Sequence, residues 1–190
     1  MGTVGIMVFD DVEELDFVGP LEVFGVAGRL GADCRPLLIA EGPGMIACRY
    51  GLRLEPHATF TTCPRLDLLI VPGGPGARTH ARENPAILEF VRRHESSVAS
   101  VCTGALVLAS AGLLQGRRAT THYSALDLLR AYEGVTVESN VRMIFDDPIA
   151  TSAGISAGID LALALVAREW GVDLAREVAR RLEWEGRWQA

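Results

Sequence analysis

The chain has 190 residues, 49% of them hydrophobic, and a formal net charge of −6 at pH 7, which predicts a single domain, residues 1–190, with a sizeable core. The acidic balance and the lack of any basic block argue against nucleic acid as a direct partner. The sequence contains no lysine, which excludes Schiff-base chemistry, pyridoxal phosphate attachment and a P-loop.

Short apolar runs alternate with helical patterns along the whole chain. Strands are predicted at Val4–Phe9, Arg35–Ala40, Leu66–Val71, Val98–Val101, Ala119–Thr121, Val141–Phe145 and near Ile149–Thr151. Helices are predicted at Pro20–Arg29, Pro85–His94, Thr103–Ala111, Ala125–Tyr132, Ser156–Trp170 and Val172–Leu182, with Pro20 and Pro85 in first-turn positions. Residues 43–62 are less regular and are expected to form a small hairpin at one edge. The pattern predicts an α/β fold with a doubly wound, mostly parallel sheet and helices on both faces.

The cysteines and the N-terminus indicate the compartment. Residues 1–9 are apolar but lack a basic flank and a cleavage site, so we expect a first strand and no signal peptide. No apolar run is long enough to cross a bilayer. The four cysteines show no Cys-x-x-Cys pair and no paired histidines, which predicts a cytoplasmic protein without a disulfide framework or a structural zinc site. They are Cys34, Cys48, Cys63 and Cys102.

Residues 97–111 are the most informative stretch of the sequence. A buried strand is predicted to end at Val101, Cys102 follows without a spacer, and an Ala- and Leu-rich helix begins at once. The small residues Ser100 and Gly104 flank the cysteine, as in a strained strand-to-helix turn that presents a nucleophile. The helix start predicts a lowered thiol pKa and fast alkylation. A buried structural cysteine is the alternative that this pattern leaves open.

Two glycines follow the predicted strand Leu66–Val71. Gly73 and Gly74 allow a tight turn, and we expect its backbone N–H groups to face an anion that develops on a substrate. Ligands of a parallel sheet bind at the carboxyl ends of its strands, where Cys102 is also predicted. The two glycines match neither a dinucleotide-binding fingerprint nor a P-loop.

Asp16 is the candidate acid. It belongs to an acidic loop after the first predicted strand, where most carboxylates are expected to be solvated. Leu15 and Phe17 flank Asp16, which predicts partial burial, a raised pKa and proton transfer near the thiol. A helix cap near Pro20 is the alternative interpretation.

His122 is the candidate among the four histidines. It follows the predicted strand Ala119–Thr121 and therefore belongs to the same edge of the sheet. A histidine beside a cysteine nucleophile acts as a base or orients a neighbouring group. A structural histidine at a strand end is the alternative.

Five short motifs occur in a specific order, and together they resemble the ThiJ/PfpI superfamily within the class I glutamine amidotransferase-like, flavodoxin-like fold. The resemblance extends from Val4 to about Leu182. The motifs are Leu15-Asp-Phe-x-Gly-Pro20, Val71-Pro-Gly-Gly74, Val101-Cys-Thr-Gly104, Ala119-Thr-Thr-His122 and Thr151-Ser-Ala-Gly154.

Within this superfamily, the Cys-Thr-Gly elbow and the aspartate of the first loop are most similar to those of isocyanide hydratases. The resemblance implies that Cys102 attacks the terminal isocyanide carbon and that Asp16 handles the proton. It also implies that Thr103 helps to bind or orient the substrate and water. A soft thiolate suits an electrophilic carbon. The implied product is an N-formamide, and neither a cofactor nor a metal is implied.

Other activities of the superfamily fit this sequence less well. Family peptidases and glyoxalase- or deglycase-like members carry Cys-His-Gly at the elbow, whereas Thr103 stands in place of that histidine. Glutamine amidotransferases have a His-x-Glu pair late in the domain, and this sequence has no histidine after His122.

A sensor without catalysis is the alternative from a different class. The N-terminal domains of AraC-type regulators share the elbow and the Ala-Thr-Thr-His stretch, and they continue into a helix-turn-helix segment. Because this sequence stops at Ala190, we expect no DNA binding of that kind, which leaves a ligand or oxidant sensor.

The superfamily resemblance also implies a homodimer with the active site near its interface, and a small molecule as substrate.

Overall fold

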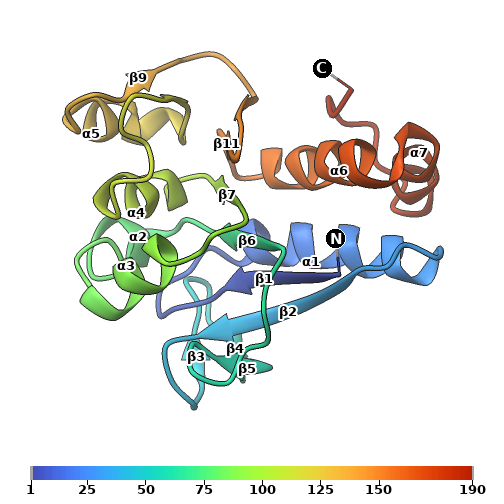
Figure 1. Cartoon of the computed structure of the whole chain (residues 1–190), viewed down its shortest axis with the longest axis horizontal. Coiled ribbons are helices and arrows are strands. Elements are labelled where there is room, and N and C mark those ends of the chain that lie inside the picture. The colour runs from blue at the N-terminus through green and yellow to red at the C-terminus, as the bar shows by residue number, and fades with distance from the viewer. Residues whose placement is uncertain (1, 190) are drawn as a thin grey trace.

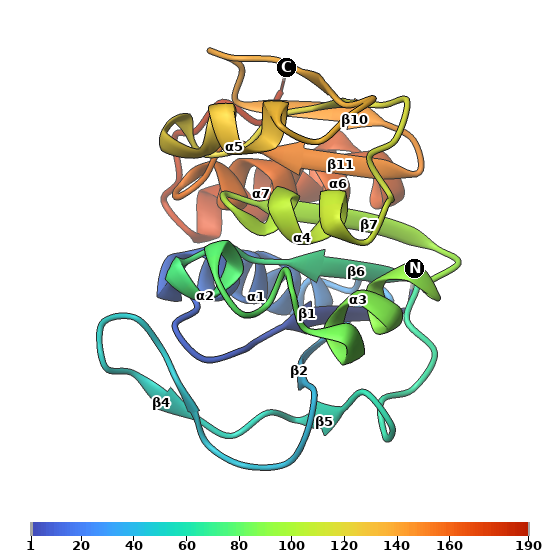
Figure 2. The ribbon, with the colours of Figure 1, turned by 90° about the vertical axis from the view of Figure 1, so that its left-hand side faces the viewer.

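The computed structural model describes residues 2–189 and has a seven-stranded sheet at its centre. The strand order is β10-β11-β7-β6-β1-β2-β5 (Figure 2), and only β10 is antiparallel to its neighbour in this sheet. The strands are β1 (Thr3–Met7), β2 (Arg35–Ala40), β5 (Ala58–Thr59), β6 (Leu68–Val71), β7 (Ser97–Val101), β10 (Met143–Asp146) and β11 (Ile149–Ser152). The central β6 is buried along its whole length, because helices cover both faces of the sheet.

The helices form two layers, one on each face of the sheet (Figure 1). One layer consists of α1 (Glu14–Arg29), α6 (Ala157–Trp170) and α7 (Val172–Arg181). The other consists of α2 (Pro75–Arg78), α3 (Pro85–Arg92), α4 (Gly104–Ser110) and α5 (Leu126–Arg130), with a 3₁₀ turn η1 (Tyr123–Ala125) before α5. The predicted α/β fold with a mostly parallel sheet is therefore confirmed. Among the described residues, no helix combines the length and the apolar character needed to cross a membrane.

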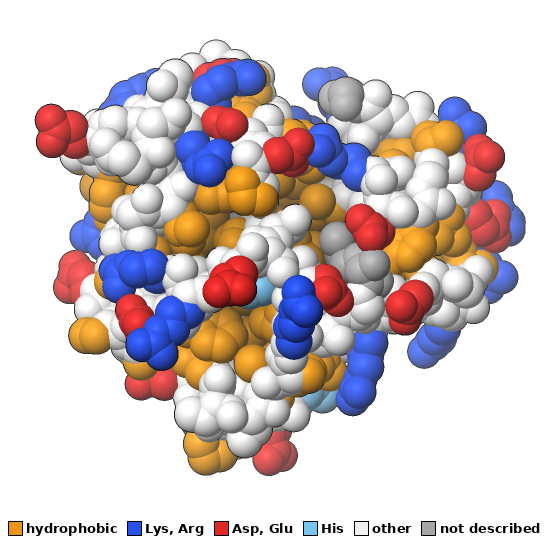
Figure 3. All heavy atoms as spheres, viewed as in Figure 1, with side chains coloured by type: hydrophobic (Ala, Val, Ile, Leu, Met, Phe, Trp, Pro, Cys, Tyr) orange, Lys and Arg blue, Asp and Glu red, His pale blue; other side chains and the backbone are white. Residues whose placement is uncertain are grey.

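The surface carries charges of both signs. On the face in Figure 3, arginine and acidic side chains are interspersed, with hydrophobic side chains visible between them. Several arginines of the chain pair with a carboxylate one turn away on the same helix, as in the Arg180–Glu177 pair at 2.6 Å. Such exposed pairs contribute little to stability.

Two small sheets lie outside the central one. The expected hairpin within residues 43–62 is present as β3 (Ile46–Ala47) and β4 (Arg53–Leu54). The predicted strand Ala119–Thr121 is wrong. Only β8 (Arg118–Ala119) forms, and it pairs with β9 (Thr136–Val137) away from the central sheet. Thr120 and Thr121 leave the ladder because they bond elsewhere, Thr120 through its N–H to Thr151 Oγ1 and Thr121 through its hydroxyl to the carbonyl of Cys102.

The start of α1 differs from the prediction, and the difference moves Asp16. The helix begins at Glu14, and Pro20 lies inside it rather than in its first turn. Proline removes one helical hydrogen bond, but Pro20 is buried and α1 packs on α6, which offsets the loss. Asp16 is consequently a buried residue of the first turn of α1, and its side chain does not cap the helix.

Candidate active site

Cys102 occupies a strained turn directly after β7. Its φ angle is +55°, in the left-handed region that residues other than glycine rarely adopt, so the strained turn predicted there is confirmed. Its N–H donates to the carbonyl of Ser152 at 3.1 Å, which ties the turn to β11. A Cβ atom at Gly104 would lie 2.0 Å from the carbonyl oxygen of Val71, so only glycine lets α4 approach β6 this closely.

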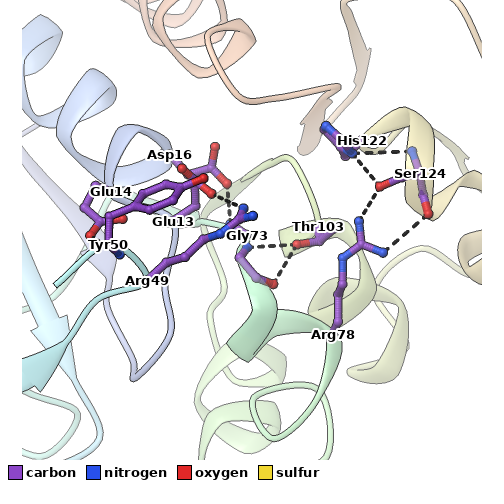
Figure 4. Close-up of polar contacts among 11 residues, drawn as sticks. Glu13, Glu14, Asp16, Arg49, Tyr50, Gly73, Arg78, Thr103, His122 and Ser124 are labelled. Atoms are coloured by element: carbon purple, nitrogen blue, oxygen red, sulfur yellow. Dashed lines mark hydrogen bonds and ion pairs between the residues drawn. The ribbon is translucent and has the colours of Figure 1, made fainter.

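Asp16 lies below this turn, completely buried. Its Oδ2 accepts the N–H of Gly73 at 2.9 Å (Figure 4), and its Oδ1 has no hydrogen-bond partner among the described residues. Burial raises the pKa of Asp16 to about 8; the Gly73 bond opposes this rise and the neighbouring Glu13 adds to it. The carboxyl also interacts electrostatically with the Cys102 thiol. Asp16 is therefore poised to exchange a proton near neutral pH.

The predicted low pKa of Cys102 is wrong. Burial, first, and the charge of Asp16, second, raise the pKa of this thiol above its ordinary value, although the backbone N–H of Thr103 opposes them. Cys102 is only 6% exposed, and α4 has just seven residues, so the helix start does not outweigh burial. Burial also raises the pKa of Cys34 and Cys48 to about 11. The thiol and the carboxyl of the Asp16–Cys102 pair are thus both neutral at rest.

The turn at Gly73 and Gly74 does not offer free N–H groups. Gly73 donates to Asp16, and Gly74 donates to Thr103 Oγ1 at 2.9 Å, while the Thr103 hydroxyl donates to the Gly74 carbonyl at 3.2 Å. Our expectation that these two groups face a developing anion is therefore wrong for this structure, because side chains already occupy both donors. A Cβ atom at Gly73 would lie 2.6 Å from Thr103 Oγ1, so glycine is needed for this close approach.

The structure supports a positioning role for Thr103 that can be tested with two variants. Thr103→Val would leave the buried Gly74 N–H unpaired, at a cost of about 1–3 kcal/mol, whereas Thr103→Ser keeps the hydroxyl. We expect Thr103→Val to lower the free energy of unfolding by that amount in urea titrations and to reduce any activity about tenfold through the displaced turn. Thr103→Ser is the matched control, and equal behaviour of the two variants would contradict this role.

His122 belongs to a network on the opposite side of the pocket. Its Nδ1 accepts the backbone N–H of Ser124 at 3.4 Å and lies 2.8 Å from the Ser124 hydroxyl, to which Arg78 donates at 2.6 Å (Figure 4). This arrangement assigns the ring proton to Nε2. Burial, followed by the charge of Arg78, lowers the pKa of His122 below its ordinary value, so the ring is neutral. No hydrogen bond joins His122 to Cys102 or Asp16 within residues 2–189.

Glu13 and Arg49 are site residues that the sequence analysis did not identify. Glu13 was expected to be solvated, but it is 4% exposed, and its carboxylate pairs with Arg49 at 2.5 Å (Figure 4). Arg49 comes from the β3–β4 hairpin, far from Glu13 in the sequence. No local pattern marks such a pair, because burial of a carboxylate depends on a partner that the fold supplies.

These residues surround a pocket of about 380 Å³ at the carboxyl ends of β6 and β7. Cys102, Thr103, Gly74 and His122 line it, whereas Asp16 and Gly73 are not on its surface. The remaining lining residues are Glu13, Arg49, Pro75, Arg78, Tyr123, Ser124 and Ile155. A larger cavity of about 720 Å³ lies beside α3 and residues 60–66, and none of the predicted site residues lines it. In the part of the chain that the structure describes, no cluster of His, Cys, Asp or Glu could bind a metal ion.

A cysteine on a strained strand-to-helix turn, with a buried carboxyl behind it, places the chain among α/β proteins that carry a cysteine at the carboxyl edge of a parallel sheet. The sequence profile of the DJ-1/PfpI family matches residues 2–168. The chain belongs to the DJ-1/PfpI family.

Relatives within this family include enzymes and regulators. Isonitrile hydratase from Pseudomonas putida is 39% identical over 184 residues, which cover 95% of this chain and 78% of that protein. The HTH-type transcriptional regulator CdhR from Pseudomonas aeruginosa is 34% identical over 88% of this chain, but the match spans only 50% of the regulator. The sequence motifs had indicated a resemblance to both of these classes, isocyanide hydratases and AraC-type regulators.

Solved structures agree on the fold. A ThiJ/PfpI family protein from Pseudomonas syringae superposes with a TM-score of 0.88 at 30% identity, over 98% of this chain and 76% of that one. Drosophila melanogaster DJ-1beta superposes with a TM-score of 0.87 at 20% identity, over 97% of this chain and 99% of that one.

Proposed function

We propose that this chain is a cysteine-dependent isocyanide hydratase, a lyase that converts an isocyanide and water into an N-formamide. The observation that carries the proposal is the pairing of Cys102 with the buried Asp16, whose Oδ1 has no partner among the described residues. Leaving such an oxygen unpaired is costly unless a substrate or water uses it. The identity to isonitrile hydratase supports the same reaction.

The first step is the addition of the thiol to the isocyanide carbon. The sulfur of Cys102 forms a bond to the terminal carbon while its S–H bond breaks, and the carboxylate form of Asp16 receives the proton at Oδ1 and passes it to that carbon. The product is a thioimidate held on Cys102. The raised pKa of the thiol is compatible with this step, because the S–H proton is itself a reactant.

The second step is hydrolysis of the thioimidate. Water adds to the same carbon, one of its protons reaches the nitrogen through Asp16, and the carbon–sulfur bond then breaks. The second water proton returns to Cys102, and the N-formamide leaves. In this reaction only Cys102 and Asp16 exchange protons, and both lie at the site described above. The sum is one isocyanide and one water consumed for each formamide.

The test is formamide production with turnover. Purified protein is mixed with cyclohexyl or phenyl isocyanide, and the formamide is quantified by mass spectrometry. More formamide than protein supports the hydratase. Its absence across several isocyanides favours the sensor, which the similarity to CdhR supports and which needs no acid beside the thiol.

The four cysteines are free thiols, which supports a reducing compartment such as the cytoplasm.

We also propose that the chain forms a homodimer. Exposed hydrophobic side chains gather at the β3–β4 hairpin and the start of α1, which are joined by the bond from Tyr50 N–H to Glu14. They are Leu15, Met45, Tyr50 and Leu52, and Arg49 links this surface to the pocket. Covering such side chains favours association.

Sedimentation at micromolar concentration is expected to show a dimer, and Leu52→Arg is expected to produce monomers. Leu128→Arg is the matched control, because Leu128 is similarly exposed, 41% against 46%, but lies on α5. A monomeric wild-type protein would contradict the proposal.

A further inference from the structure

The pocket beside Cys102 has one charge without a counter-charge. Glu13 and Arg49 neutralise each other at 2.5 Å. Asp16 lies behind Cys102 and does not line the pocket, and His122 is neutral because burial and the charge of Arg78 lower its pKa. Arg78 remains. Arg78 is half-buried as a residue, and its guanidinium pairs with no carboxylate among the described residues. The pocket is therefore positively charged inside a chain whose net charge is −6.

The neutral partners of Arg78 hold its guanidinium in place and leave donors free. Nη2 donates to the Ser124 hydroxyl at 2.6 Å, and Nη1 donates to the Ser124 carbonyl at 3.4 Å. A guanidinium has five N–H donors in a planar fork that matches a carboxylate, so roughly three remain for a ligand. Figure 4 shows this side chain extending from α2 toward Ser124 and His122.

The Nε2–H of His122 supplies a further donor on the same wall of the pocket. The ring is oriented by Ser124, the residue that also holds Arg78. A carboxylate placed between the two side chains would accept from both. A neutral alkyl group placed there would leave the guanidinium without the counter-charge that a partly buried cation favours.

From this charge balance we infer that the substrate carries a carboxylate, which Arg78 binds while Cys102 attacks the isocyanide carbon at the other end. The substrate class is thus an isocyano acid of short chain, and the product is an N-formyl amino acid. The isocyanide end of this inference rests on the proposed hydration, whereas the anion site at Arg78 does not. A pocket of about 380 Å³ holds a molecule of this size.

Binding of the implied products tests the anion site without requiring turnover. The ligands are N-formylglycine and N-formyl-β-alanine, each compared by calorimetry with its neutral primary amide. Wild-type protein is expected to bind at least one of the acids about tenfold more tightly than the matching amide. Equal affinity for acid and amide at both chain lengths, or binding of neither, would overturn the inference, and this comparison needs no variant.

Variants then show which residue causes the preference for the acid over the amide. Arg78→Gln keeps hydrogen bonding to Ser124 but removes the charge, so the preference for the acid is expected to vanish. Arg78→Lys keeps the charge and is expected to retain part of it. Arg65→Gln changes the net charge equally at an exposed position lining the other cavity, and it should leave the preference intact. A preference that survives Arg78→Gln would place the anion site elsewhere and overturn the inference.

Turnover separates this inference from the proposed function. Isocyanoacetate and methyl isocyanoacetate form a pair that differs in charge, and wild-type protein is expected to hydrate the acid with the higher kcat/KM. Hydration of both at equal rates would refute the carboxylate preference and leave the hydratase standing. If the acids bind tightly but no isocyanide is hydrated, the anion site stands and the proposed function fails.

Discussion

Replacing Cys102 with alanine is expected to abolish formamide production, with a loss of at least about 10⁴-fold in kcat that reaches the detection limit of the assay. No other thiol can substitute for it. Among the cysteines, all of which the structure describes, Cys102 alone lines the pocket beside Asp16, and Cys63 lies at the larger cavity. Because the thiol forms the covalent bond to the isocyanide carbon, its removal eliminates the whole pathway rather than one contribution to it.

The matched control is Cys63→Ala, which removes a cysteine from the other cavity and should retain full turnover. Circular dichroism checks that Cys102→Ala keeps its fold. The substitution removes one sulfur from a tightly packed turn, so a modest loss of stability, about 1–2 kcal/mol, is expected. Residual turnover by Cys102→Ala above the control without protein would contradict covalent catalysis.

Local sequence signals were sufficient to identify the cysteine turn and six of the seven strands of the central sheet, but not the two-residue β5. An apolar strand followed at once by Cys102, and small residues on either side, describe a geometry that depends on neighbours in the sequence. The boundaries of α4, α6 and α7 fall within a residue or so of the predicted ones for the same reason.

Features that depend on distant partners could not be predicted. Burial of Glu13 is tolerated because Arg49, from the β3–β4 hairpin, forms an ion pair with it. Arg78 is held at the pocket by its hydrogen bond to Ser124. The pKa of Cys102 was misjudged because the sequence shows a helix start but not the depth of burial, and desolvation dominates. Pro20 was misplaced because tertiary packing let α1 begin six residues earlier.

Asp16→Asn is expected to reduce kcat/KM by about 10²–10⁴-fold, the range of a lost proton-transfer group, with the fold intact. The amide oxygen can still accept the Gly73 N–H, so the contact at 2.9 Å has a replacement. Wild-type kcat/KM should rise with pH and level off above about 8, because only the ionised carboxyl accepts the thiol proton. The variant should lack this inflection.

The same substitution is expected to make the protein more stable. The pKa of Asp16 is 3.8 in the unfolded chain and about 8 in the folded protein, so the folded state binds more protons between these values. The free energy of unfolding of the wild type therefore falls as pH rises through this window. Asparagine does not titrate, so the advantage of Asp16→Asn should grow from pH 4 to pH 8, to the order of a few kcal/mol.

Asp160→Asn provides a matched control with the opposite expected sign. Asp160 is also completely buried, but it pairs with Arg142 and accepts the indole N–H of Trp184 at 2.7 Å. Removing one charge of such a pair leaves the other uncompensated and is destabilising. Urea unfolding at pH 8 should thus show a gain for Asp16→Asn and a loss for Asp160→Asn. If both variants had a lower free energy of unfolding than the wild type, Asp16 would stabilise the fold. Its burial beside Cys102 would then not indicate that stability is lost at this site in favour of proton transfer.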